Sequence, residues 1–234
     1  MSLLQDRNII LIVTIVSILL VLVYYAYKKL SDLKLLKTVT HPKRGTPSER
    51  SLVLTLLKMG FPAETIFHDL YLKKQKNGYS QTDLVLLTEV GLLVFEVKDY
   101  SGWIYGTWKD RYWTQVLAYG RDKYRFYNPI MQNNTHIEEL KKHSIHLHGL
   151  PFYSIVVFYG NSDLKHLDYV PDKTCLIKPG HLSEVIRYIL TNSEPANYTN
   201  KPEVMRLLKN AVINGANIEI QIEHIRNIRN MDFS

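Results

Sequence analysis

Two neighbouring apolar segments decide the fold of this chain: Thr82-Asp-Leu-Val-Leu-Leu-Thr88 and Leu92-Leu-Val-Phe-Glu-Val-Lys98. A short turn separates them, so we expect an antiparallel hairpin in the core of a sheet. Charged side chains are rarely buried unless they are paired. Asp83, Glu96 and Lys98 nevertheless interrupt these apolar runs. Their placement predicts a compensating partner, for which a divalent metal ion is the obvious candidate.

The register of the hairpin determines whether these charges meet. If Thr88 pairs with Gly91, Asp83 stands opposite Glu96, and opposed side chains have Cβ atoms about 4.5–5.5 Å apart. Lys98 shares the face of Glu96, because alternate residues of a strand point the same way. Two carboxylates this close cannot both ionise cheaply without a cation. A slip of one residue would send the two acids to opposite faces.

The tripeptide 96–98 is weak evidence when it is taken alone. The pattern Asp/Glu-x-Lys also occurs at 32–34, 139–141 and 163–165. Only 96–98 ends an apolar, β-like run that has a matching acid on the preceding run. The alternative is an ordinary ion pair of an acid with lysine in a half-exposed sheet.

The composition limits the class of protein. The 234 residues are 46% hydrophobic and 22% charged, which is typical of one globular domain with an appendage rather than of a disordered chain. The formal net charge of +7 favours an anionic partner, either nucleic acid or a phospholipid surface, with plain solubility as the alternative. The single cysteine, Cys175, excludes an internal disulfide framework and suits a reducing compartment.

The N-terminus contains a candidate membrane segment. Residues 9–27 are uncharged and apolar, and their length is close to the roughly 20 residues that cross a bilayer as a helix. A cleaved signal peptide is the alternative, although it usually has a shorter apolar core and a small-residue cleavage site. Only Arg7 precedes the segment, whereas several lysines follow it. The positive-inside bias predicts an N-terminus outside and a soluble domain in the cytoplasm.

These features divide the chain into four parts. We expect a transmembrane anchor at 1–30, a basic juxtamembrane linker at 31–44, a core at 45–150, and a C-terminal α/β extension at 151–234. The extension either completes the core or is appended to it.

The order of helices and strands follows from periodicity and turn signals. We expect a helix from Thr46 to Gly60, a second helix from Pro129 to about His148, and two more at 181–190 and 202–214. The expected strands are 65–72, 82–88, 92–98, 112–116, 124–127, 153–159 and 174–177, with a turn at Asn77-Gly78. The last 20 residues are ambiguous. This order predicts a mixed α/β sandwich built on one sheet.

Five short motifs occur in order over roughly residues 43–145. They are Gly45-Thr-Pro-Ser-Glu49, Gln81-Thr-Asp83, Gly91-Leu-Leu-Val-Phe-Glu-Val-Lys98, Gly102-Trp-Ile-Tyr-Gly106, and Asn128-Pro-Ile-Met-Gln132 with His136. Together they resemble the nuclease-related domain, NERD, whose members are similar to the PD-(D/E)xK nuclease superfamily. The resemblance implies a restriction-endonuclease-like α/β fold, a mixed sheet flanked by helices, here preceded by one transmembrane helix.

The resemblance also implies a set of site residues. Glu49, Asp83, Glu96 and Lys98 would line a metal-dependent site, with Gln132 close by. Two positions depart from the family pattern. Leu84 stands where the family usually has histidine, and Asp99 stands where asparagine is frequent.

The chemistry of such a site follows from its side chains. Oxygen ligands suit Mg²⁺ or Mn²⁺, so Asp83 and Glu96 are the expected direct ligands, and Glu49 is expected to hold a metal-bound water. Lys98 would orient or deprotonate the attacking water, or stabilise charge that develops on the phosphate. Gln132 would contact phosphate or a metal-bound water.

We therefore expect a membrane-anchored, metal-dependent nuclease that hydrolyses phosphodiester bonds of DNA or RNA. The alternatives are a non-catalytic module that binds nucleic acid or protein at the membrane, and a scaffold whose basic charge meets anionic lipid.

The segment 103–127 adds a separate hint of nucleic-acid binding. It is rich in tryptophan and tyrosine, which either stack unpaired bases or pack in a hairpin core. Arg121, Lys123 and Arg125 alternate along it, and they either contact phosphates or guard an edge strand. The histidines at 143, 146 and 148 suggest either zinc or a polar helix end.

Overall fold

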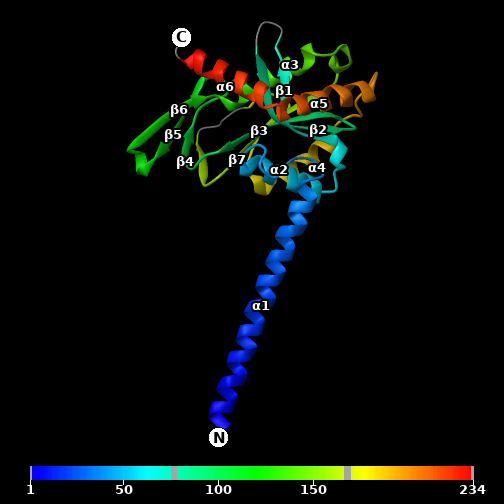
Figure 1. Ribbon diagram of the computed structural model, residues 1–234. Coiled ribbons are helices and arrows are strands. Elements are labelled where there is room, and N and C mark those ends of the chain that lie inside the picture. The colour runs from blue at the N-terminus through cyan, green and yellow to red at the C-terminus, as the bar shows by residue number, and fades with distance from the viewer. Residues whose placement is uncertain (1, 75–77, 166–169, 233–234) are drawn as a thin grey trace.

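A five-stranded mixed sheet forms the centre of the computed structural model, which describes residues 2–74, 78–165 and 170–232 (Figure 1). The strands run in the order β1-β2-β3-β7-β9, with β1, β2 and β3 antiparallel and with β7 and β9 parallel to β3. Their bounds are β1 Ile66–Lys73, β2 Tyr79–Thr88, β3 Gly91–Asp99, β7 Phe152–Tyr159 and β9 Thr174–Ile177. Asn77 of the expected turn lies outside the described residues.

The expected hairpin is the β2–β3 pair, and its register is the predicted one. Thr88 pairs with Gly91, and the ladder continues outward to Leu84 opposite Phe95. Continuing this register by one residue would bring Asp83 opposite Glu96, and the charge of Glu96 does act on Asp83.

A second sheet, absent from the one-sheet prediction, contains four strands in the order β6-β5-β4-β8. These strands are β4 Gly102–Tyr105, β5 Tyr112–Leu117, β6 Asp122–Tyr127 and β8 Ser162–Lys165. The chain leaves β3 for this sheet at Gly102, whose φ of +77° lies in the left-handed region. A Cβ atom there would collide with the carbonyl oxygen of Val116, so only glycine permits the close approach of β4 to β5.

The described part of the chain contains six α-helices. They are α1 Ser2–Leu36, α2 Pro47–Lys58, α3 Pro129–Lys142, α4 Leu182–Asn192, α5 Lys201–Ala216 and α6 Ile218–Asp232. Short 3₁₀ turns lie in four of the connections between helices and strands, η1 Ala63–Thr65, η2 Ala118–Gly120, η3 Ile145–Leu147 and η4 Pro179–His181. The helix expected to reach about His148 therefore ends at Lys142, and the ambiguous C-terminal stretch is helical. His143 contacts the main-chain carbonyls of Glu139 and Lys73 instead of continuing the helix.

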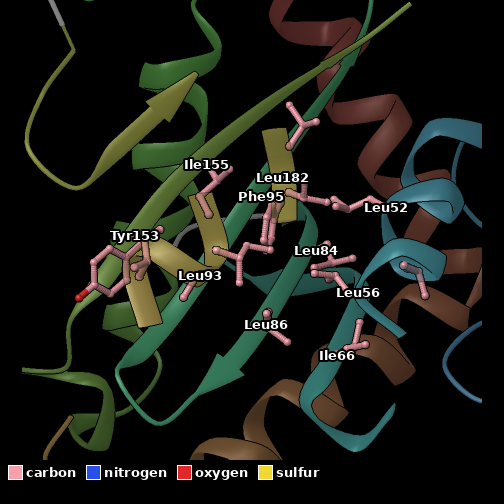
Figure 2. Close-up of a cluster of buried hydrophobic side chains, with 14 of the residues drawn as sticks. Leu52, Leu56, Ile66, Leu84, Leu86, Leu93, Phe95, Tyr153, Ile155 and Leu182 are labelled. Carbon is pink, nitrogen blue, oxygen red and sulfur yellow. The ribbon is translucent and has the colours of Figure 1, made fainter. Parts of the chain in front are cut away.

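The two faces of the central sheet bury different side chains because alternate residues of a strand point to opposite sides. On one face, α2 and α4 pack against Leu84, Leu86, Leu93 and Phe95 (Figure 2). On the other face, α3 and α5 cover Val85, Leu87, Leu92 and Val94. In Figure 1, α2 and α4 lie where α1 meets the domain, whereas α3, α5 and α6 lie on the far side.

The C-terminal region belongs to the same sheet and the same apolar clusters. β7 pairs with β3 from Leu92 opposite Phe152 to Asp99 opposite Tyr159. Buried residues of α4 and α5, among them Leu182 and Leu208, pack on the two faces of the sheet. The strands β7 and β9 and the helices α4 and α5 are therefore part of the packed sheet and its apolar clusters.

The N-terminal helix contains the candidate membrane segment. Residues 7–36 form one helix that is long and apolar enough to cross a bilayer, and none of its apolar window is buried by the rest of the protein. The first part of the expected linker is helical, since α1 continues to Leu36, which is buried in the apolar cluster under α2. Asp32 forms an ion pair with Lys58 of α2, 2.6 Å apart. The end of α1 therefore contacts the domain directly.

Candidate metal-dependent site

Asp83 lies near the middle of β2 and faces α3. It shares the alternation of Val85 and Leu87, which pack under α3 and α5. Its Oδ2 atom accepts a hydrogen bond of 2.8 Å from the main-chain nitrogen of Val97 on β3. This bond fixes the carboxylate against the neighbouring strand, beside Glu96.

Glu96 is almost fully buried, with 1% of its surface exposed. Its Oε1 atom lies 2.7 Å from the Lys98 ammonium, two residues along the same face of β3. Its Oε2 atom lies 3.4 Å from Nε2 of His136. Among the described residues, no hydrogen bond reaches that oxygen with acceptable geometry. One oxygen of a buried carboxylate is therefore left without a strong partner.

Helix α3 supplies the other two groups of the site. Gln132 and His136 are one turn apart on this helix and share one side of it. The Lys98 ammonium donates a hydrogen bond of 2.9 Å to Oε1 of Gln132. His136 places Nδ1 3.1 Å from the hydroxyl of Ser80 on β2. The helix thus closes the polar cluster from above the sheet.

Two buried asparagines hold α3 in place: Asn128, which begins one of the motifs quoted from the sequence, and Asn133, which the sequence did not single out. Asn128 caps the helix by accepting from the nitrogen of Ile130, and its amide donates to the carbonyls of Thr107 and Asp110. Asn133 donates to the carbonyl of Val94 at 2.8 Å and to the hydroxyl of Ser154 at 2.9 Å. The signal for Asn128 was its position directly before a proline, which is typical of a helix start.

Glu49 belongs to a neighbouring network rather than to this cluster. Its Oε1 accepts from the hydroxyl of Thr46 at 2.8 Å, and its Oε2 lies 3.2 Å from Nε2 of His68. The other ring nitrogen of His68 lies 2.9 Å from the hydroxyl of Thr40. Burial raises the pKa of Glu49, but the bonds from His68 and Thr46 outweigh burial and lower it overall.

The two departures from the family pattern have distinct surroundings. Leu84 points to the α2 face, away from Asp83, and packs in that apolar cluster. Its partner on β1 is His68, so a histidine does occupy this face, next to Glu49. Asp99 accepts a hydrogen bond from the hydroxyl of Ser48 in the first turn of α2.

The charges of the cluster are unevenly compensated. Burial, followed by the negative charges of Glu96 and Glu49, raises the pKa of Asp83 well above its ordinary value. Burial also acts to raise the pKa of Glu96, but Lys98 and His136 outweigh it, so that pKa is lowered. Burial acts to lower the pKa of Lys98, but Glu96 outweighs it and that pKa is raised. Lys98 is therefore a firmly protonated cation, and Asp83 is the acid that lacks compensation.

The residues present fit a divalent cation held by two carboxylates. Asp83 with its raised pKa and Glu96 with its unbonded oxygen are the two groups that a cation would satisfy. No three acidic, histidine or cysteine side chains gather closely enough to hold a metal ion within the described ranges. Mg²⁺ is commonly bound through one or two carboxylates and otherwise keeps water, so a two-carboxylate site suits it.

A cavity of about 300 Å³ opens beside this cluster. Asp83 from β2, Gln132 and His136 from α3, Tyr127 from β6 and His224 from α6 are among its lining residues. His224 is fixed there by a contact of 3.0 Å between its Nδ1 and the carbonyl oxygen of Tyr79. No sequence signal identified His224, because the stretch that became α6 had no clear periodicity.

A second buried charge pair lies on β1 near the cavity. Asp69 has a left-handed φ of +56° within the strand, which is unusual for a residue other than glycine. Its carboxylate accepts from Arg44 at 2.8 Å and from the side chain of Gln81 at 3.0 Å. Arg44 also donates to the carbonyl of Val212 in α5. This network ties the segment before α2 to the C-terminal helices.

A comparison with known protein families matches part of the chain. Residues 44–159 match the model of the nuclease-related domain family. The motifs from Gly45 to His136 all lie within that match, and this part of the chain is therefore a nuclease-related domain.

A relative gives a second comparison. The chain is 30% identical over 125 residues to an uncharacterized protein of Bacillus anthracis, across 53% of this chain and 57% of that protein. The chain thus aligns with less than two thirds of that relative's length. No solved structure matches the chain.

Proposed function

We propose that this protein is a membrane-anchored, metal-dependent nuclease that hydrolyses phosphodiester bonds of DNA or RNA. The single observation that carries the proposal is the buried charge cluster in which the Asp83 carboxylate is held against β3 beside Glu96, with Lys98 hydrogen-bonded to Gln132. The nuclease-related domain at 44–159 supports it.

Each side chain has a role that its surroundings suit. Asp83 and Glu96 would hold Mg²⁺ or Mn²⁺. When bound, such an ion polarises the scissile phosphate and lowers the pKa of a bound water. Lys98 would act as a cation that stabilises negative charge on the phosphate, because its raised pKa disfavours the role of a base. Gln132 would position Lys98 through their hydrogen bond, and Glu49 would add negative charge from the edge of the site.

The membrane part of the proposal is supported by α1. We propose that residues 9–27 span the bilayer with the N-terminus outside and the domain in the cytoplasm, since basic residues concentrate after the segment. Protease treatment of intact and permeabilised cells tests this orientation. Digestion of the domain in intact cells would contradict it.

The catalytic test compares the full-length protein in detergent with two acid-to-amide variants. Asp83→Asn and Glu96→Gln should lose cleavage of labelled DNA or RNA in Mg²⁺ by about 10²-fold or more, and calorimetry should show weaker Mg²⁺ binding. Glu184→Gln is the matched control, because Glu184 is an exposed acid on α4. Equal cleavage by the Asp83 and Glu96 variants and the control would reject the assigned site.

The alternative is a non-catalytic module that binds nucleic acid or protein at the membrane. One observation favours it, namely that Glu96 is already neutralised by Lys98 within a buried ion pair. Under this alternative, calorimetry shows no Mg²⁺ binding while salt-sensitive nucleic-acid binding persists.

A further inference from the structure

The outer face of the four-stranded sheet combines exposed aromatic rings with basic side chains. Trp113 and Phe126 pair across β5 and β6 and turn inward to an apolar cluster. By alternation, Tyr112 of β5 and its partner Tyr127 of β6 lie on the opposite face, where they are 43% and 40% exposed. Tyr112 and Tyr127 on this outer face are partly exposed, whereas Trp113 on the inner face is fully buried.

The rings and the cations on this face are arranged together. The Tyr112 and Tyr127 rings meet edge to face with centroids 6.1 Å apart. The guanidinium of Arg125 lies 5.0 Å from the centre of the Tyr112 ring, and that of Arg111 lies 5.6 Å from it. Lys123 shares the alternation of Arg125 and Tyr127 along β6. The face therefore combines aromatic rings with two guanidinium groups that lie over the Tyr112 ring.

The charge of this region is suited to a polyanion. Residues 103–127 contain five basic and two acidic side chains, a net charge of +3. The neighbouring carboxylates of Asp83 and Glu96 would repel phosphates without a cation. A basic surface next to it supplies the attraction that the acidic site lacks.

The outer face is continuous with the candidate site. Tyr127, the last residue of β6, lines the same cavity as Asp83 and Gln132. Asn128 follows directly and caps α3, which carries Gln132. A nucleic-acid strand that lies along β6 would thus reach the carboxylates of Asp83 and Glu96 at the Tyr127 end of β6.

We infer that the outer face of β5 and β6 binds single-stranded nucleic acid and guides it to the candidate site. Bases stack on Tyr112 and Tyr127, while Arg111, Lys123 and Arg125 contact phosphates. Base–aromatic stacking requires unpaired bases, so the inferred ligand is a single strand rather than a duplex. The inference rests on the proposed function, since it names the substrate class of that same site.

The test measures binding apart from cleavage. The full-length Asp83→Asn protein in detergent, with EDTA, is titrated against fluorescent oligothymidylate and oligouridylate of 15 nucleotides and against a duplex of equal length. Tyr112→Ala and Tyr127→Ala should each weaken single-strand binding by about tenfold, while Tyr127→Phe should retain it. Arg125→Ala should lower the slope of log affinity against log salt by about 0.7.

The matched control is Tyr124→Ala. Tyr124 lies on the same strand and is 55% exposed, but alternation places it on the other side of the sheet. The Tyr124→Ala variant should bind the single strands with the same affinity as the parent protein. Thermal unfolding of each variant confirms that it is folded, and a folded Tyr127→Phe keeps the test valid if an alanine variant is unstable.

Several outcomes overturn the inference. One is single-strand binding that the tyrosine variants leave unchanged, and another is duplex binding that equals or exceeds single-strand binding. A third is that the tyrosine variants lose binding only to vesicles of anionic lipid. None of these outcomes affects the test of Asp83-dependent cleavage by the wild-type protein. The two proposals therefore fail separately. Preference for oligothymidylate or oligouridylate identifies DNA or RNA as the source of the strand.

Discussion

At the scale of single residues, Asp83 and Glu96 differ in how their charges are compensated. Glu96 has Lys98 and His136 beside it, whereas Asp83 accepts one main-chain bond and faces two other acids. The pKa of Asp83 is raised and that of Glu96 is lowered for this reason. The metal-free site is therefore destabilised by ionisation of Asp83 and stabilised by ionisation of Glu96.

Asp83→Asn should stabilise the metal-free protein at neutral pH while it abolishes the response to Mg²⁺. Because the pKa of Asp83 is higher in the folded state, wild-type stability is lost as pH rises from about 3.9, the unfolded value, through the folded pKa. The stability gap between variant and wild type should be absent below that range, grow across it and stay constant above it. Thermal unfolding in EDTA across pH, repeated with Mg²⁺, measures this, and a variant less stable than wild type at pH 7 would contradict it.

Lys98→Gln should lower cleavage by about 10²–10³-fold, because it removes a positioned cation from the phosphate site. The raised pKa of Lys98 predicts that its protonation does not limit activity between pH 7 and 10. Rate profiles of the wild type and of Lys98→Arg check this. A change in rate below pH 10 that disappears in Lys98→Arg would instead indicate that Lys98 acts as a base.

At the scale of elements, the position of α3 over the sheet decides whether the site exists. Asn133 is fully buried and bonds the helix to the carbonyl of Val94 and to Ser154. Because the sheet carries the carboxylates and α3 carries Gln132, a shift of this helix would separate the two halves of the site.

Asn133→Ala should lower the free energy of unfolding by about 2–4 kcal/mol, since it leaves buried polar groups unpaired and opens a cavity. Asn134→Ala is the control, because Asn134 is exposed on the same helix. Urea unfolding compares the two variants. Equal stability would show that the Asn133 bonds do not anchor α3.

At the scale of the whole molecule, the end of α1 and the segment after it pack into the folded domain. Leu36 packs in the α2 cluster, Thr40 contacts His68, and Arg44 pairs with the buried Asp69. A fragment that begins at residue 45 would lose all three.

The fragment 45–234 should therefore be less stable than the fragment 30–234. Removal of Arg44 leaves the Asp69 carboxylate buried without its cation, which by itself costs about 3–5 kcal/mol. Denaturant unfolding of the two fragments measures the difference, with Lys43→Ala in the longer fragment as a control for an exposed cation. Indistinguishable midpoints would mean that residues 30–44 are dispensable for folding.

The sequence by itself determined the hairpin, its register and the apolar N-terminal helix. Those features depend on local patterns, namely alternation with period two around a glycine turn and an uncharged run of membrane length. The pairing of Thr88 with Gly91 follows from the same few residues that form the turn.

Only the tertiary structure decided the second sheet, the partners of Glu49 and the part of the cavity lining that comes from α6. Each depends on contacts between residues far apart in the chain, such as Glu49 with His68, or His224 with Tyr79. The reversal at Gly102 and the side of the sheet that each helix covers decide these contacts. Local periodicity predicts which face of a helix or strand is apolar. The packing of the whole chain decides which other element that face packs against.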